Sequence, residues 1–198
     1  MLRDESGLCQ KGAVADQVRV LFMADTHLGF DLPIRPRIER RRRGHDIRAN
    51  FQRVIQAARD HRVHGVIHGG DLFHRSRVAP QLVDMVFAPL KQLADAGVHI
   101  YIVPGNHERS QIPHSELSFH PKIHVFTRPR TFVLRRADRT LAISGFAHTH
   151  EIRRRFRDVL AATDWRRIPA QHRLLCMHQC VEGATVGPNG YRFRRGKD

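Results

Sequence analysis

Short apolar runs alternate with segments of helical periodicity over the first half of the chain. Three runs of strand length, rich in β-branched and large apolar residues, occur at 18–24, 65–68 and 98–103. Between them, helical spacing predicts one helix at 46–61, with Asp46 as a suitable N-cap, and another at 80–96, ended by Gly97. This order of strand, helix and strand predicts an α/β fold built on a parallel sheet.

The second half of the chain has a different pattern. Two runs at 131–134 and 140–144 flank Ala137-Asp138-Arg139 and predict a β-hairpin. A helical pattern lies between Glu151 and Ala162, and a further strand is expected at 173–177. No internal repeat or low-complexity linker divides the chain.

Length and composition are those of one globular domain. A chain of 198 residues with 41% hydrophobic residues can bury one core, so we expect a polar tail at 1–17 and one domain at 18–198. No run of about 18 apolar residues is present, and the first residues are polar, which predicts a cytoplasmic protein with no membrane span or secretory signal. The cysteines Cys9, Cys176 and Cys180 are too few for a disulfide framework, so we expect buried or idle thiols.

The net charge of +15 comes almost entirely from arginine, because lysine occurs at only four positions. Arginine binds phosphate through two parallel hydrogen bonds, and a dense positive field attracts nucleic acid. A G- and C-rich genome would also favour arginine over lysine. That explanation does not account for the excess of 34 basic residues over 19 acidic residues, so a polyanionic partner is expected.

Three polar fragments follow the three predicted strands of the first half, namely Asp25-Thr26-His27, Gly70-Asp71 and Asn106-His107-Glu108. The carboxyl ends of parallel strands meet at one crevice, so we expect these side chains to converge. The i, i+2 spacing of Asp25 and His27 on an extended segment predicts that both point the same way. His178 follows the later strand and is expected at the same crevice.

This set of carboxylate, amide and imidazole groups predicts a centre with two divalent metal ions. Such ligands without thiolate suit Mn²⁺, Fe²⁺, Co²⁺ or Zn²⁺. Two ions about 3.5–4 Å apart activate a bridging water and hold a phosphoryl group. His107 would then be available to donate a proton to the leaving group, with Glu108 orienting its imidazole from behind.

The three fragments resemble the signature of the calcineurin-like metallophosphoesterases. Within that superfamily, the segments at 25–29, 70–74 and 177–179 resemble the nuclease subunit of DNA double-strand-break repair complexes. The resemblance implies a β-sandwich flanked by helices, DNA as the substrate, an SMC-like ATPase partner and a possible homodimer. It also implies two Mn²⁺ ions, held by Asp25, His27 and Asp71 and by Asp71, Asn106 and His178. His107 would assist leaving-group departure, and His74 would lie near the scissile phosphate.

The family completes its site with a Gly-x-His-x-His motif downstream of the position that His178 matches. No histidine occurs at 181–198, so we expect one ligand per ion to be missing, weakened metal binding, and a C-terminally truncated chain. Ala147-His148-Thr149-His150 has the right spacing but precedes His178. Gly145-Phe146, just before this segment, indicates a turn out of the sheet. His148 and His150 are therefore not assigned as ligands.

Two arginine runs are candidate contacts to a DNA backbone, Arg40-Arg41-Arg42-Arg43 and Arg153-Arg154-Arg155. The alternative for either run is an ordinary solvated face. Three functions remain open from the sequence: a two-metal DNA exonuclease or endonuclease acting in repair, a phosphatase or phosphodiesterase on a smaller substrate, and a non-catalytic DNA-binding module. The first is favoured by the resemblance.

Overall fold

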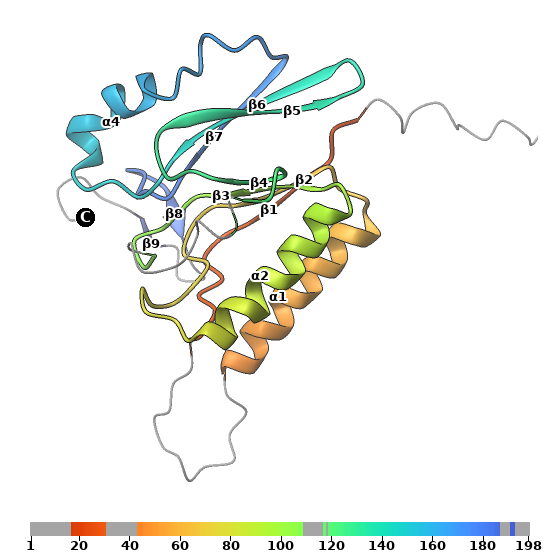
Figure 1. Ribbon diagram of the computed structural model, residues 1–198. Coiled ribbons are helices and arrows are strands. Elements are labelled where there is room, and N and C mark those ends of the chain that lie inside the picture. Colours follow the sequence, from red (N-terminus) through yellow and green to blue (C-terminus); the bar gives the residue numbers. More distant parts are fainter. Residues whose placement is uncertain (1–16, 31–42, 109–116, 118, 187–190, 193–198) are drawn as a thin grey trace, which may run out of the picture.

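The computed structural model describes residues 17–30, 43–108, 117, 119–186 and 191–192. The first sheet has four parallel strands in the order β1-β2-β3-β4. Its strands are β1 (Val20–Met23), β2 (Gly65–His68), β3 (His99–Ile102) and β4 (Ile123–Val125). Helices α1 (Arg43–Asp60) and α2 (Pro80–Asp95) cover one face of this sheet (Figure 1).

A second sheet packs on the other face of the first. It contains β5 (Arg130–Arg136), β6 (Arg139–Phe146) and β7 (His172–Met177), with β5 and β6 antiparallel and β6 and β7 parallel. Helix α4 (Ile152–Ala161) connects the two parallel strands. A short hairpin follows, formed by β8 (Thr185–Val186) and β9 (Tyr191–Arg192).

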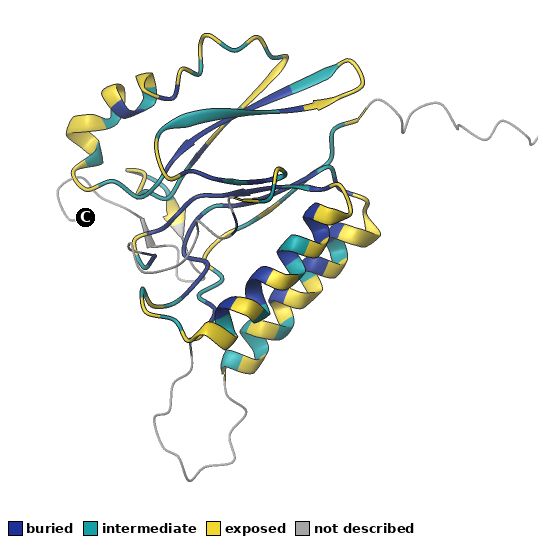
Figure 2. Cartoon of the chain, viewed as in Figure 1, coloured by how far each residue is buried: buried dark blue, intermediate teal, exposed yellow. Residues whose placement is uncertain are grey.

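Side-chain alternation along the central strands explains the two layers. In β3, Ile100 and Ile102 face the helices and join a core cluster with Val86 and Phe87 of α2, while Tyr101 points into the space between the sheets. Successive residues of a strand face opposite sides, so the apolar residues of β3 contribute to two cores. Figure 2 shows the resulting buried inner faces of both helices and of the sheets. Each fully buried large apolar side chain contributes about 1.5–3 kcal/mol.

The predicted elements of both halves are present, with three differences. Helix α1 begins at Arg43, so Asp46 lies in its first turn and is not its N-cap. Gly145 and Phe146 are the last residues of β6, paired with Cys176 and Met177, so the predicted turn there is wrong. Strands β4, β8 and β9 were not predicted, because two or three residues are too few to show a period.

Three expectations from composition can be compared with the described residues. The expected tail at 1–17 lies almost entirely outside the described residues. Within the described part of the chain, no helix is long and apolar enough to cross a membrane. Cys176 is a buried free thiol whose pKa burial raises to about 11, and Cys180 is exposed.

Candidate metal centre

The first two motifs remain joined after their strands end. The backbone N–H groups of Asp25, His27 and Leu28 donate to the carbonyl oxygens of residues 70, 71 and 72, each at 2.9 Å. This parallel pairing runs past the carboxyl edge of the sheet, as far as the bridge between Leu28 and Phe73. The Asp25-Thr26-His27 and Gly70-Asp71 segments therefore form one supported surface.

Three of the candidate ligands have a left-handed backbone. The φ angles are 51° at Asp25, 43° at His27 and 53° at Asp71. This conformation is uncommon for residues other than glycine, although Asp and His adopt it more readily than most, and such strain is concentrated at functional sites. The expectation of an extended segment was therefore wrong. Asp25 and His27 still meet, with Oδ1 of Asp25 4.0 Å from Nε2 of His27.

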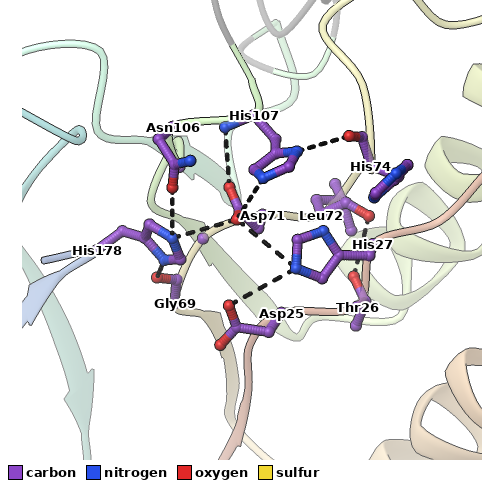
Figure 3. Close-up of polar contacts among 12 residues, drawn as sticks. Asp25, Thr26, His27, Gly69, Asp71, Leu72, His74, Asn106, His107 and His178 are labelled. Atoms are coloured by element: carbon purple, nitrogen blue, oxygen red, sulfur yellow. Dashed lines mark hydrogen bonds and ion pairs between the residues drawn. The ribbon is translucent and has the colours of Figure 1, made fainter. Parts of the chain in front are cut away.

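Asp71 is the centre of the cluster. Its side chain is 5% exposed, and its Oδ2 lies 3.7 Å from Nε2 of His27, 3.8 Å from Nε2 of His107 and 3.4 Å from Nε2 of His178 (Figure 3). Its other oxygen, Oδ1, accepts a hydrogen bond from the backbone N–H of His107 at 3.1 Å. One carboxylate thus faces imidazoles from three separate loops.

The His178 side of Asp71 fits a metal ion. Nδ1–H of His178 donates to the Gly69 carbonyl oxygen at 3.0 Å, which leaves the lone pair on Nε2. That nitrogen faces Oδ1 of Asn106 at 3.2 Å and Oδ2 of Asp71 at 3.4 Å. Two donors that share one ion, each about 2.1 Å from it, lie roughly 3.0–3.5 Å apart. Three electron-pair donors this close together repel one another, and a cation bound between them would remove that repulsion.

The other side of Asp71 offers a second group of ligands. One carboxylate or imidazole atom from each of Asp25, His27 and Asp71 lies within 4.8 Å of the others. Both groups consist of oxygen and nitrogen donors without thiolate, which suits Mn²⁺ and similar ions. The two groups share Asp71, so the donor set fits a pair of divalent ions bridged by one carboxylate.

Two glycines make room for these ligands. A Cβ atom at Gly105 would collide with the Asp71 carboxylate, and one at Gly70 would collide with the His178 imidazole. Gly70 also has a φ of 118°, which side chains rarely tolerate. Gly70 and Gly105 are therefore needed for the close approach of the candidate ligands His178 and Asp71.

His107 and His74 lie beside the ligands. Nδ1–H of His107 donates to the His74 carbonyl oxygen at 2.6 Å, so Nε2 is directed toward Asp71. The His74 ring lies 5.5 Å from that of His107 and 5.6 Å from that of His27. Burial, followed by the charges of His27 and His107, lowers the pKa of His74, which favours its neutral form.

Glu108 has a different place from the one expected. Its Oε1 accepts from the Phe73 N–H and its Oε2 from the Gly105 N–H, both at 3.0 Å, and the residue is 5% exposed. Burial raises its pKa, while these two N–H donors act in the opposite direction. The contact that orients the His107 imidazole comes from the His74 carbonyl instead. Glu108 joins the loop after β2 to the loop after β3.

Glu108→Gln is expected to destabilise the fold more than it alters the chemical step. The amide can accept from one N–H but presents its NH₂ group to the other, leaving buried donors facing each other at a cost of about 1–3 kcal/mol. We expect a loss of that size in denaturant unfolding, with the chemical rate per folded molecule reduced less than tenfold. A much larger loss of rate at unchanged stability would instead indicate a direct chemical role.

Two positioning residues were missed by sequence reasoning. The Thr26 hydroxyl donates to the Leu72 carbonyl at 3.0 Å and lies 2.9 Å from Nε2 of His68. Nδ1 of His68 in turn accepts from the Gly70 N–H at 3.3 Å. This partly buried chain of hydrogen bonds connects the first two motifs. In the sequence, the only indication of this role was the polar residue Thr26 between two candidate ligands. His68 gave no indication, because it lies within a predicted strand.

The candidate DNA contacts are placed only in part. Arg40, Arg41 and Arg42 lie outside the described residues, and Arg43 is exposed at the start of α1. The second run, Arg153-Arg154-Arg155, is exposed on α4, where Arg154 pairs with Glu151 at 3.7 Å. Figure 1 places α4 at the same end of the molecule as the carboxyl ends of β1, β2 and β3.

Comparisons with known families and proteins show what this chain is similar to. A family described as calcineurin-like phosphoesterase matches residues 18–180. The DNA double-strand break repair protein Mre11 of Haloferax volcanii is 40% identical over 95 residues, 47% of this chain and 20% of the relative. Mre11 of Saccharolobus solfataricus is 25% identical over 173 residues, 83% of this chain and 42% of the relative. The chain therefore spans less than half the length of these relatives.

Two solved structures are similar to parts of this chain. A dimetal phosphatase from Danio rerio aligns with a TM-score of 0.45 and 16% identity, over 69% of this chain and 48% of the other. The Pseudomonas putida nuclease MPE aligns with a TM-score of 0.41 and 22% identity, over 68% and 57%.

Proposed function

This chain belongs to the calcineurin-like phosphoesterase family, and we propose that it hydrolyses phosphodiester bonds of DNA with two divalent metal ions, Mn²⁺ in the first instance. The observation that carries the proposal is the convergence on Asp71. Four further ligands from three other loops surround its carboxylate, namely Asp25, His27, Asn106 and His178. His107 stands beside them and is held by a backbone carbonyl.

The proposed chemistry divides between the metal pair and His107. Bound ions would supply a nucleophilic hydroxide and neutralise the charge of the phosphate. In the imidazolium form, His107 would donate its Nε2 proton to the departing alkoxide, while its Nδ1–H stays hydrogen-bonded to the His74 carbonyl. The neutral His74 imidazole would lie near the scissile phosphate, against His27 and His107.

DNA is favoured as the substrate by charge and by similarity. The net charge of +15 and the exposed arginines of α4 offer contacts to phosphates beyond the one being cleaved. The similarity to archaeal Mre11 proteins points in the same direction. From that resemblance we also propose an SMC-like ATPase as a partner, which co-elution of the two purified proteins on a sizing column would test.

The test compares two substrates under the same conditions. We expect Mn²⁺-dependent release of nucleotides from a labelled duplex, abolished by a chelator, with slow turnover of a generic aryl phosphate. Efficient turnover of the aryl phosphate alone would indicate a phosphatase on small substrates. DNA binding that persists in chelator, with no cleavage in Mn²⁺, would indicate a non-catalytic DNA-binding module.

A further inference from the structure

A second loop reaches the Asn106 and His178 side of the centre. Strand β6 runs parallel to β7, with Phe146 paired to Met177, so both strands end at the same edge of their sheet. His178 is the first residue after β7, and His148 is the second after β6. The parallel register brings two histidines 30 positions apart in the chain to neighbouring loops.

The backbone of this second loop is anchored to the loops that carry the ligands. The His148 N–H donates to the Pro104 carbonyl oxygen at 2.8 Å, two residues before Asn106. The Gln179 side-chain NH₂ donates to the Thr149 carbonyl oxygen at 3.3 Å, one residue after His178. His148 is therefore held from both sides, although its own side chain is only half-buried.

The position of the ring indicates a place beside the metal ion rather than on it. The ring centres of His148 and His178 are 6.5 Å apart, and the rings are inclined at 64°. Two neighbouring imidazole ligands of one ion, each bound at about 2.1 Å, have ring centres roughly 4.5–5.5 Å apart. His148 is too far away for this, yet close enough to reach an oxygen of a group bound to the ion.

We propose that His148 is a further substrate-binding residue, which donates a hydrogen bond to a non-bridging oxygen of the phosphate on the Asn106 and His178 side. Figure 3 shows His27 and His74 across Asp71 from His178. A phosphate bound between the two groups of ligands would then contact His148 on one side and the histidines near His27 on the other. The inference rests on the proposed two-metal site, but not on DNA as the substrate.

The chain beyond His148 extends the same surface. Helix α4 begins four residues later, and its exposed arginines start at Arg153. A strand whose phosphate is bound beside His148 would place the next phosphates toward this helix. Helix α4 would then be the path of the substrate away from the centre.

The test uses inorganic phosphate as the probe and the Mn²⁺-loaded protein. Isothermal titration should show that His148→Ala binds Mn²⁺ as the wild type does but binds phosphate about tenfold or more weakly, as expected for loss of a hydrogen bond to a charged group. His148→Asn, which keeps an N–H donor, should recover part of that affinity. Steady-state measurements should show a raised KM with kcat changed less than threefold.

His150→Ala is the matched control, because this histidine belongs to the same loop and is exposed, with its ring 5.3 Å from that of His148. It should bind phosphate as the wild type does. Weaker Mn²⁺ binding in His148→Ala would overturn the proposal in favour of a ligand role, and unchanged phosphate affinity would overturn it outright. A wild type that binds Mn²⁺ and phosphate but cuts no DNA would contradict the proposed substrate alone.

Discussion

Asp71→Asn is expected to abolish the binding of both metal ions. The carboxylate is the one donor that both groups of ligands share, and its Oδ2 lies 3.7 Å from Nε2 of His27 and 3.4 Å from Nε2 of His178. An amide oxygen is neutral and cannot bridge two divalent ions. Since loss of one electrostatic stabiliser typically costs 10²–10³ in rate, we expect kcat to fall by about 10³ or more.

Thermal unfolding in the presence of Mn²⁺ measures this effect without activity. An ion at 100 times its dissociation constant stabilises the fold by about 2.7 kcal/mol, which raises the Tm of a domain of this size by roughly 5–10 °C. Because the wild type is proposed to bind two ions, we expect about twice that rise in the wild type and none in Asp71→Asn. In chelator the two proteins should melt within a few degrees of each other, because the amide keeps the hydrogen bond from the His107 N–H.

Asp25→Asn is the matched comparison. Asp25 belongs to only one of the two groups of ligands, and its side chain is 62% exposed. We expect this variant to keep one Mn²⁺ ion and about half of the rise in Tm. If Asp71→Asn instead retained both ions, the shared-carboxylate centre would be wrong.

His107→Ala is expected to slow DNA cleavage by about 10²–10⁴ while leaving metal binding intact. The Nδ1–H of His107 is held by the His74 carbonyl and its Nε2 faces Asp71 at 3.8 Å, and in the proposed mechanism this Nε2 donates a proton. Loss of a general acid matters most when the leaving group is a strongly basic alkoxide, as it is in DNA.

A pair of substrates distinguishes this role from a structural one. An aryl phosphodiester releases a weakly basic phenolate that needs no proton, so we expect His107→Ala to slow its turnover by less than tenfold. His120→Ala is a suitable control, because His120 pairs with Asp95 at 3.0 Å outside the site. Equal losses on both substrates would argue against proton donation by His107.

The main features of the fold and the ligand types were predictable from local patterns. The alternation of apolar strand-length runs with helical segments predicted the parallel sheet around β2 and β3. Residues such as Asp71 and Asn106 were recognised because they belong to an ordered set of polar fragments that follow successive predicted strands, whose carboxyl ends meet at one crevice. The sequence pattern also separated the antiparallel hairpin of β5 and β6 from the parallel half.

Other features depended on contacts between distant segments, which a local pattern does not contain. Glu108 joins two loops by accepting hydrogen bonds from the N–H groups of Phe73 and Gly105. This role could not be predicted, because the sequence does not show that Phe73 and Glu108, 35 positions apart, lie in contact. The orienting contact to His107 comes from a backbone carbonyl, and backbone groups have no sequence signature. The extension of β6 to Phe146, which brings His148 beside His178, came from pairing with a strand 31 positions later.

The sequence by itself determined the chemistry that this protein can offer: oxygen and nitrogen ligands, no thiolate among them, and an arginine-rich surface. This follows because residue types and their spacing set the available donors and the alternation of the strands. Only the tertiary structure decided how those donors are directed. Left-handed backbone at Asp25, His27 and Asp71, and the room left by Gly70 and Gly105, turn separate motifs toward one carboxylate. Such directions arise from packing and hydrogen bonds between loops, which exist only once the chain has folded.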